Sequence, residues 1–390
     1  MFRISVWHGD LSDSYLKKVT QLGVDCLDFG SGGYFPGVKE QGSPDLDALL
    51  KIKKKLRSYG LEINRVTLPD LTEKFIQGRK GGDQELANSC QALRVFGEAG
   101  LSIARQRFAG DTFPQKMRRY ASEHRGGYRS RGEALARKTA PIPSPEELEK
   151  WWERFSLAYS QLVPIAEENG VKLAIHPSDT PNVETPLGGL GFHRVIDAFP
   201  SRSVGYLYCC GTRAEAGGPG LVLDELHNYG RKGRIFMVHL RNVRGSLATA
   251  GAFEEVLLDD GDLNPFKILL ELKRVGFSGC VNPDHIPPIE GDGPLVEQGL
   301  AYSVGYLKAL LAALAALCGR GRHEKNRRHH HRVPDPLPRR IHETLGLCVS
   351  RTWTSSSKSS NRWTARSRPS SGRSSTSSPE QSSAACTLTR

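Results

Sequence analysis

The chain has 390 residues, enough for one large barrel or two ordinary domains, which excludes a disulfide-stapled mini-protein and a peptide-sized binder. It carries 54 Lys and Arg against 42 Asp and Glu, but residues 319–390 alone hold 15 basic and 4 acidic side chains. Residues 1–318 are therefore nearly neutral, with 39 basic against 38 acidic residues, and the basic character that would suggest nucleic acid belongs to the tail.

The eight cysteines have no short regular spacing, and the first residues enter a strand-like run without the apolar core of a signal peptide. We therefore expect reduced thiols and a cytoplasmic location. The apolar stretch around Leu307 to Cys318 is interrupted by Lys308 and is shorter than the roughly 20 residues of a membrane span. We expect it to form a buried, Ala- and Leu-rich closing helix.

One unit recurs from residue 1 to about residue 318: a short apolar run, a polar loop, a helical stretch and a glycine. Three helices are marked by a capping side chain, a proline at the first position and a glycine after the last turn: Ser43 to Gly60, Ser144 to Gly170, and Asn264 to Gly276. Ser144 and Glu147 also fit a capping box.

Apolar and β-branched runs predict eight strands: Arg3 to Trp7, Val24 to Phe29, Leu61 to Leu68, Leu101 to Phe108, Val171 to His176, Val204 to Cys209, Arg234 to Leu240 and Gly279 to Asp284. Several are apolar at consecutive positions, which is typical of parallel strands covered on both faces. The pattern predicts an α/β fold, a (β/α)8 TIM barrel over residues 1–318. An open doubly wound sheet would need a glycine fingerprint after the first strand, where only His8-Gly9-Asp10 follows.

Two segments do not fit the repeating unit. Residues 109–144 form a long insertion after the fourth strand, which is either a lid that brings Tyr128, Arg129 or Arg131 to an anionic substrate or a solvated loop. Residues 319–390 are rich in Ser, Arg and His and poor in large aliphatic residues, so we expect a disordered tail.

Active sites of such barrels lie at the carboxyl ends of the strands. There the last four predicted strands present His176, Cys209, His239 and Asp284 at matching depth. Imidazole, thiolate and carboxylate are the usual side-chain ligands of divalent transition metals. The four strand ends therefore predict a metal site, although each residue alone would also fit a structural role.

These residues lie in segments that resemble the mannonate dehydratase family, within the xylose isomerase-like barrels. The likeness covers about residues 165 to 290 and rests on His176-Pro177-Ser178-Asp179-Thr180-Pro181, Tyr208-Cys209-Cys210-Gly211-Thr212, His239-Leu240-Arg241-Asn242-Val243, Phe253-Glu254-Glu255 with Asp260-Gly261-Asp262, and Pro283-Asp284-His285. It is weak in the first 160 residues and absent beyond Cys318.

The resemblance implies a Mn²⁺ enzyme that converts D-mannonate to 2-keto-3-deoxy-D-gluconate by loss of water. It makes His176, Cys209, His239 and Asp284 the metal ligands, His285 an acid or base, and Arg241 and Asn242 contacts of substrate oxygens. His8, Glu255 and Asp179 are secondary candidates for orienting the substrate or the ligands. A thiolate ligand by itself favours zinc or iron, so Zn²⁺ and Fe²⁺ stay open.

The chain departs from the family after Asp284-His285. The family continues there with Gly-Arg and a loop tyrosine, whereas Ile286-Pro287-Pro288 follows here, and the family also tends to place a histidine near Leu258. We expect Tyr128 and Arg129 of the insertion to substitute, Tyr128 in catalysis and Arg129 in substrate binding.

Two other functions remain open at this stage. The first is a metal-dependent isomerase or epimerase of a sugar, because the same fold and metal position support proton transfer between adjacent carbons. The second is a non-catalytic barrel whose basic tail binds nucleic acid. The expected partner is a small sugar acid, with no membrane, nucleic acid only through the tail, and homo-oligomerisation left open.

Overall fold

The computed structural model describes residues 2–111, 117–136, 143–178 and 185–327 of the chain. All of them lie in one compact unit, Met1–His331. The predicted disorder of residues 319–390 falls, from residue 328 onward, outside the described residues.

Eight parallel strands close into a barrel in the order β1-β12-β9-β8-β7-β4-β3-β2, which confirms the predicted fold. Every predicted strand is present. The barrel strands are β1 (Arg3–Trp7), β2 (Cys26–Asp28), β3 (Glu62–Thr67), β4 (Ile103–Arg105), β7 (Lys172–Ile175), β8 (Val204–Cys209), β9 (Ile235–His239) and β12 (Cys280–Asn282).

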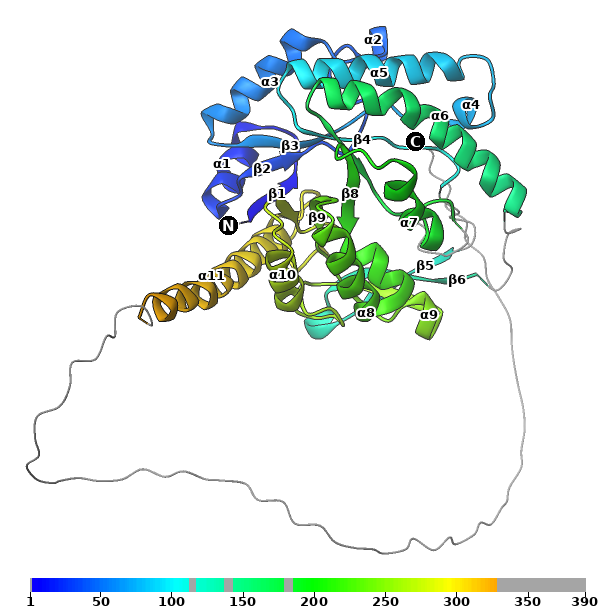
Figure 1. Cartoon of the computed structure of the whole chain (residues 1–390). Helices are drawn as coiled ribbons and strands as arrows, with labels where there is room; N and C mark the ends of the chain where they lie inside the picture. The colour runs from blue at the N-terminus through cyan, green and yellow to red at the C-terminus, as the bar shows by residue number, and fades with distance from the viewer. Residues whose placement is uncertain (1, 112–116, 137–142, 179–184, 328–390) are drawn as a thin grey trace, which may run out of the picture. The chain divides into compact units, whose positions relative to one another are not determined.

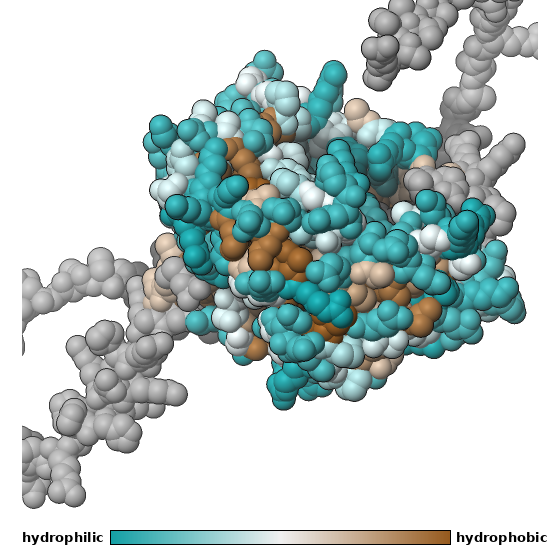
Figure 2. Space-filling view, turned by 90° about the horizontal axis from the view of Figure 1, so that it is seen from above, coloured by the Kyte–Doolittle hydropathy of each residue, from teal (hydrophilic) through white to brown (hydrophobic). Residues whose placement is uncertain are grey.

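Helices surround the barrel and cover the outer faces of its strands (Figure 1). They are α1 (Asp13–Leu22), α2 (Val38–Gln41), α3 (Leu46–Ser58), α4 (Glu73–Ile76), α5 (Gly82–Glu98), α6 (Pro145–Glu168), α7 (Gly189–Ala198), α8 (Cys210–Arg231), α9 (Leu247–Ala250), α10 (Pro265–Arg274) and α11 (Glu297–Arg327). Seen from above, the surface is mainly hydrophilic, with apolar side chains gathered in small areas (Figure 2).

The capping signals give two helix starts correctly and one wrongly. Ser144 caps α6 with the predicted capping box, and Asn264 caps α10 through its side chain and the Lys267 amide. The helix expected from Ser43 starts later, because Asp45 is the residue that accepts from the Ala48 amide, at 2.8 Å. A carboxylate two residues on therefore sets the start of α3.

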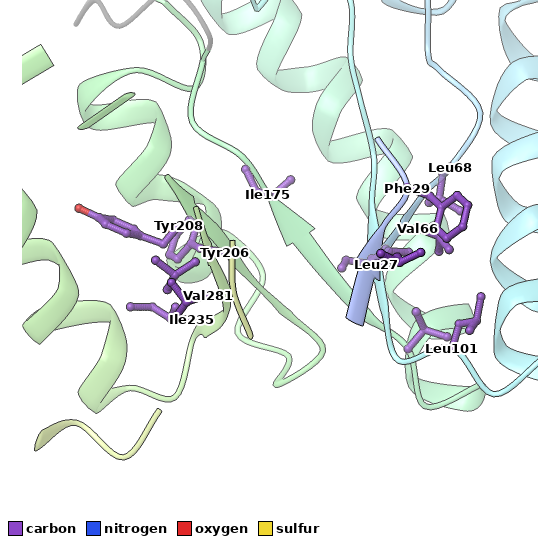
Figure 3. Packing of buried hydrophobic residues seen from close by; sticks show 14 of the residues in the cluster. Leu27, Phe29, Val66, Leu68, Leu101, Ile175, Tyr206, Tyr208, Ile235 and Val281 are labelled. Atoms are coloured by element: carbon purple, nitrogen blue, oxygen red, sulfur yellow. The ribbon is translucent and has the colours of Figure 1, made fainter. Parts of the chain in front are cut away.

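The main core lies between the barrel and its helices. On β8, Tyr206 and Tyr208 are directed toward the surrounding helices (Figure 3), where the Tyr206 hydroxyl donates to the Phe192 carbonyl and that of Tyr208 to Glu225. Such alternation directs the other side chains of the strand into the barrel. Cys209, at the end of β8, thereby faces the opposite way from its neighbour Tyr208.

The insertion after β4 forms a β-hairpin rather than an irregular loop. Its strands, β5 (Met117–Glu123) and β6 (Arg129–Leu135), flank a short 3₁₀ turn, Arg125–Gly127. Strand β6 also pairs with β11 (Ala252–Val256), which pairs with β10 (Asn242–Arg244), so the four strands form a second, antiparallel sheet. The hairpin is therefore fixed to the segment that follows β9.

The closing helix α11 is longer and more exposed than the sequence predicts. Leu307, Leu311 and Leu314 are buried, whereas the alanines between them are exposed. Its part Glu297–Leu317 is long and apolar enough to span a membrane, with a mean hydropathy of 1.7, and about one third of its most apolar stretch is buried. Because α11 packs on α1 and α10 at regular leucine spacing, we interpret it as an amphipathic helix that closes the barrel.

Candidate metal centre and active site

The predicted ligands meet at the carboxyl end of the barrel. One donor atom each of His176, Cys209 and His239 lies within 4.8 Å of the other two. Asp284 completes the group, with its Oδ2 3.9 Å from Cys209 Sγ and 3.4 Å from His239 Nδ1. The four residues come from the ends of β7, β8, β9 and β12, which are neighbours in the barrel. The four side chains, which are far apart in the sequence, therefore form one cluster in the structure.

Cys209 ends β8 and caps α8. Its sulfur accepts from the Thr212 amide at 3.5 Å and from the Thr212 hydroxyl at 3.2 Å. Burial raises the pKa of the thiol to about 12, although the charge of Arg241 opposes this shift. A cation bound at the sulfur would favour the thiolate, since metal coordination deprotonates a thiol.

Arg241 connects the ligands to a buried acid. Its Nη1 donates to Cys209 Sγ at 3.0 Å and to Asp284 Oδ2 at 2.6 Å, and its Nη2 donates to Glu215 at 2.8 Å. Burial disfavours the Asp284 carboxylate, but Arg241 and His239 hold the pKa of Asp284 well below its usual range. Burial raises the pKa of Glu215 to about 7. Arg241 thus orients two ligands rather than facing open solvent.

The donor set fits a divalent transition metal. Asp284 Oδ1 is buried and has no hydrogen-bond partner among the described residues, so it is available to a ligand. His176 Nδ1 must donate to the Pro177 carbonyl, 2.6 Å away, which leaves its Nε2 lone pair for a metal. Burial lowers the pKa of His239, which favours the neutral ring that metals bind.

His285 lies beside these ligands, as expected from its position after Asp284. Its Nδ1 is 2.6 Å from Glu255 Oε1 and 3.3 Å from Arg131 Nη2. Burial opposes ionisation of Glu255, but the hydrogen bond to His285 and the charge of Arg241 lower the pKa of Glu255. A carboxylate on Nδ1 orients the ring and directs its other nitrogen away from Glu255.

A cavity of about 540 Å³ opens over the cluster, which is large enough for a small sugar acid. His176, His239, Asp284 and His285 line it. The charged residues of the lining are five arginines, Arg65, Arg105, Arg119, Arg131 and Arg241, and three carboxylates, Asp28, Glu133 and again Asp284. The excess of arginine over carboxylate favours an anionic ligand.

Two predicted substrate contacts lie elsewhere. His8 stacks on Phe29 with ring centroids 4.6 Å apart and packs against Trp7 and Tyr34, so it belongs to an aromatic cluster. Asn242 donates to the carbonyls of Leu258 and Leu263, at 2.7 and 3.0 Å. Its side chain is buried and holds the loop after β11 instead of facing the cavity.

The structure also places Tyr128 and Arg129 away from the cavity. The Tyr128 hydroxyl donates to Asp260 at 2.8 Å and accepts from the Leu257 amide. Arg129 is paired with Glu123 at 3.2 Å, and its side chain is 74% exposed. The residue of the insertion that reaches the site is Arg131. Asp179 lies outside the described residues.

Replacing Tyr128 with phenylalanine should therefore destabilise the protein without changing turnover. The variant leaves the Asp260 carboxylate and the Leu257 amide without their partner, at a cost of about 1–2 kcal/mol. Urea denaturation measures the loss of stability, and steady-state kinetics measures turnover. A large fall in turnover with unchanged stability would restore a catalytic role for Tyr128.

The sequence analysis missed several polar residues of the site. Thr212 and Glu215 lie one helical turn apart on α8, and both accept hydrogen bonds from Arg241. Their spacing of three residues after Cys209 in a predicted helix would have placed them on one face. Arg65 lies inside β3, and an arginine in the middle of a predicted barrel strand was the available signal. Burial lowers the pKa of Arg65 to about 10, so it stays charged near neutral pH.

The comparisons with known proteins agree with this geometry. A family model described as D-mannonate dehydratase (UxuA) matches residues 142–319, which carry all four candidate ligands. Mannonate dehydratase 2 of Halalkalibacterium halodurans is 22% identical over 351 residues, covering 80% of this chain and 98% of the relative. The chain is therefore similar to mannonate dehydratases over the residues that carry the candidate ligands. A second relative, mannonate dehydratase of Streptococcus agalactiae, is 24% identical, and the match covers 69% of this chain and 86% of the relative.

Solved structures support the barrel fold of this chain. The mannonate dehydratase of Streptococcus suis serotype 2 superimposes with a TM-score of 0.68 at 22% identity, over 82% of this chain and 95% of the other. A xylose isomerase domain protein of Alicyclobacillus acidocaldarius gives a TM-score of 0.52 at 16% identity, over 80% and 99% of the two chains. Both similarities concern the barrel fold.

Proposed function

We propose that this chain dehydrates D-mannonate to 2-keto-3-deoxy-D-gluconate. The observation that carries the proposal is the convergence of His176, Cys209, His239 and Asp284 beside His285 in an arginine-lined cavity. Similarity to mannonate dehydratases supports the choice of substrate. Loss of water from a sugar acid needs an acid–base group and positive charge at the carboxylate, and both are present in the cavity.

The proposed cofactor is a divalent metal held by the two imidazoles, the thiolate and the Asp284 carboxylate. When bound, it would supply Lewis-acid stabilisation of negative charge on substrate oxygens. Family resemblance favours Mn²⁺, whereas the thiolate favours Zn²⁺ or Fe²⁺. Metal analysis of the protein purified without added metal, followed by reconstitution with each ion, tests this choice.

Side chains of the cavity would supply proton transfer and positive charge for the reaction. His285, with Glu255 on its Nδ1, exchanges a proton at the substrate, either removing the one next to the carboxylate or donating one to the leaving hydroxyl. Arg241 donates to Cys209 and Asp284 and so favours their charged forms, which are the forms that bind a metal. The cavity arginines offset the charge that develops on the carboxylate when the neighbouring proton leaves.

The test is incubation of the full chain, loaded with each metal in turn, with D-mannonate and analysis of the product. A dehydratase releases water and yields a 2-keto-3-deoxy acid. An isomerase or epimerase of the same barrel class yields a product of unchanged mass, and that result would contradict the proposal. Removal of the metal with a chelator should abolish turnover, and re-addition should restore it.

We further infer a cytoplasmic enzyme whose catalytic part is the barrel of residues 1–318. Cys26, Cys90, Cys209, Cys210 and Cys280 are free thiols, which suits a reducing compartment. Each proposed catalytic group lies before residue 319. Deletion of the tail should therefore leave the kinetics of mannonate dehydration unchanged.

A further inference from the structure

The hairpin of the insertion brings one arginine to the reacting end of the cavity. Arg131 lies on β6 opposite Ala121 of β5, and the next residue, Gly132, pairs with Glu254 of β11. The side chain of Arg131 is held between two strands and is 34% exposed into the cavity it lines. The position of its guanidinium is therefore set by the second sheet.

The guanidinium of Arg131 has a hydrogen-bond donor without a partner among the described residues. Its Nη2 donates to Glu255 Oε1 at 2.6 Å, whereas its Nε is buried and makes no hydrogen bond to any described residue. Glu133 Oε1 lies 3.5 Å from that Nε. A planar guanidinium with uncommitted donors is suited to a bidentate contact with a carboxylate.

Three other arginines that line the cavity, Arg241, Arg65 and Arg119, differ from Arg131 in their contacts. All three nitrogens of Arg241 donate to Glu215, Cys209, Asp284 or Thr212. Arg65 is buried and donates from Nη1 to the Phe29 carbonyl and to Thr67, and its Nε has no partner among the described residues; no hydrogen bond joins it to His285 there. Arg119 donates from its Nε to Glu133 at 2.8 Å, and 69% of its side chain is exposed.

The chemistry of a sugar acid adds a second constraint. The carbon that loses its proton is bonded directly to the carboxylate, so the group that binds the carboxylate must lie next to the base. Arg131 Nη2 is 3.3 Å from His285 Nδ1, which satisfies this requirement. Arg129, which the sequence analysis offered as an alternative to Arg131, makes no hydrogen bond to His285 among the described residues, and neither does Arg119.

We propose that Arg131 binds the substrate carboxylate in a bidentate contact, and that the hairpin of residues 117–135 is thereby a built part of the active site. The inference rests on the proposed function, because it takes the ligand to be an aldonate. Glu255 then has two roles: it orients His285 and, through Nη2, keeps the Arg131 fork turned toward the cavity.

The test measures binding rather than turnover. Isothermal titration calorimetry of the metal-loaded full chain compares D-mannonate with D-mannitol, which has the same carbon chain and no carboxylate. We expect Arg131→Gln to weaken mannonate binding about 10- to 100-fold, the loss of a charge-assisted contact, and to leave mannitol binding unchanged. Arg129→Gln, on the same strand but paired with Glu123, is the matched control and should bind mannonate like the parent chain.

Several outcomes would overturn the inference. Unchanged mannonate affinity in Arg131→Gln is one, and an equal loss of mannitol and mannonate binding is another. If Arg131→Gln does not fold by circular dichroism, Arg131→Lys decides: it keeps the charge without the planar fork and should bind mannonate more weakly than the parent, so full affinity contradicts a bidentate contact.

The design separates this inference from the proposed function. A parent chain that binds mannonate through Arg131 but releases no 2-keto-3-deoxy acid would refute the dehydration and support the carboxylate contact. A parent chain that dehydrates mannonate with Arg131→Gln at full affinity would support the function and refute the contact. A parent chain that binds neither D-mannonate nor D-gluconate would refute both.

Discussion

Replacement of Cys209 with alanine is expected to abolish tight metal binding and, with it, turnover. The sulfur is the donor that His239, His176 and Asp284 surround, and Thr212 and Arg241 already direct hydrogen bonds to it. Loss of a residue that only orients a ligand typically costs about 10- to 100-fold in metal affinity, so loss of the ligand itself should cost at least as much. Metal content after dialysis, measured by mass spectrometry, gives the result directly.

Cys210 provides a control from the next position in the chain. Its side chain is also fully buried, but it belongs to the hydrophobic core rather than to the metal cluster. Cys210→Ala should retain the metal, with a modest loss of stability from the small cavity it leaves. If both variants retain equal metal, the thiolate of Cys209 is not a ligand and the centre must be built differently.

The barrel could be predicted because its strands carry their own signal. Runs such as Leu173-Ala174-Ile175 are apolar at consecutive positions, and this happens where a strand is covered on both faces.

The hairpin has no such signal. Strand β5 reads Met-Arg-Arg-Tyr-Ala-Ser-Glu, with mostly exposed side chains, and the hairpin is anchored by pairing with β11, more than a hundred residues away. Pairing at that distance leaves no local pattern.

The metal ligands were predictable for the same reason, since the end of a barrel strand fixes where a side chain can point. His8 shows the limit of that rule. Trp7 ends β1 and lines the cavity, so the following residue turns to the other side of the strand and stacks on Phe29. Asn242 fails differently, because it begins β10 and so belongs to the second sheet.

The hydrogen-bond network around the ligands was beyond the reach of sequence. Glu215 and Arg241 approach from α8 and from the end of β9, and Arg131 comes from the hairpin. The contacts of these residues join elements that are far apart in the sequence, so no spacing along the chain indicates them. The contacts of Arg131 and Glu255 with His285 therefore appear only in three dimensions.

Substitution of His285 with asparagine is expected to lower kcat about 10²- to 10⁴-fold while the metal stays bound. His285 adopts a left-handed backbone conformation, with φ of 46°, and asparagine is among the residues that tolerate this conformation best. The substitution thus removes the imidazole with little backbone strain. Steady-state kinetics and metal content, measured on one preparation, separate proton transfer from metal loss.

His227→Asn is the matched control for this variant. His227 is largely exposed and pairs with Glu271 at 2.9 Å. It does not line the cavity. It should keep the parent kcat. Because Glu255 orients His285, Glu255→Gln should lower kcat in the same direction but less severely, and the double variant with His285→Asn should be no slower than His285→Asn alone. Full additivity of the two losses would mean that Glu255 acts on the substrate independently of His285.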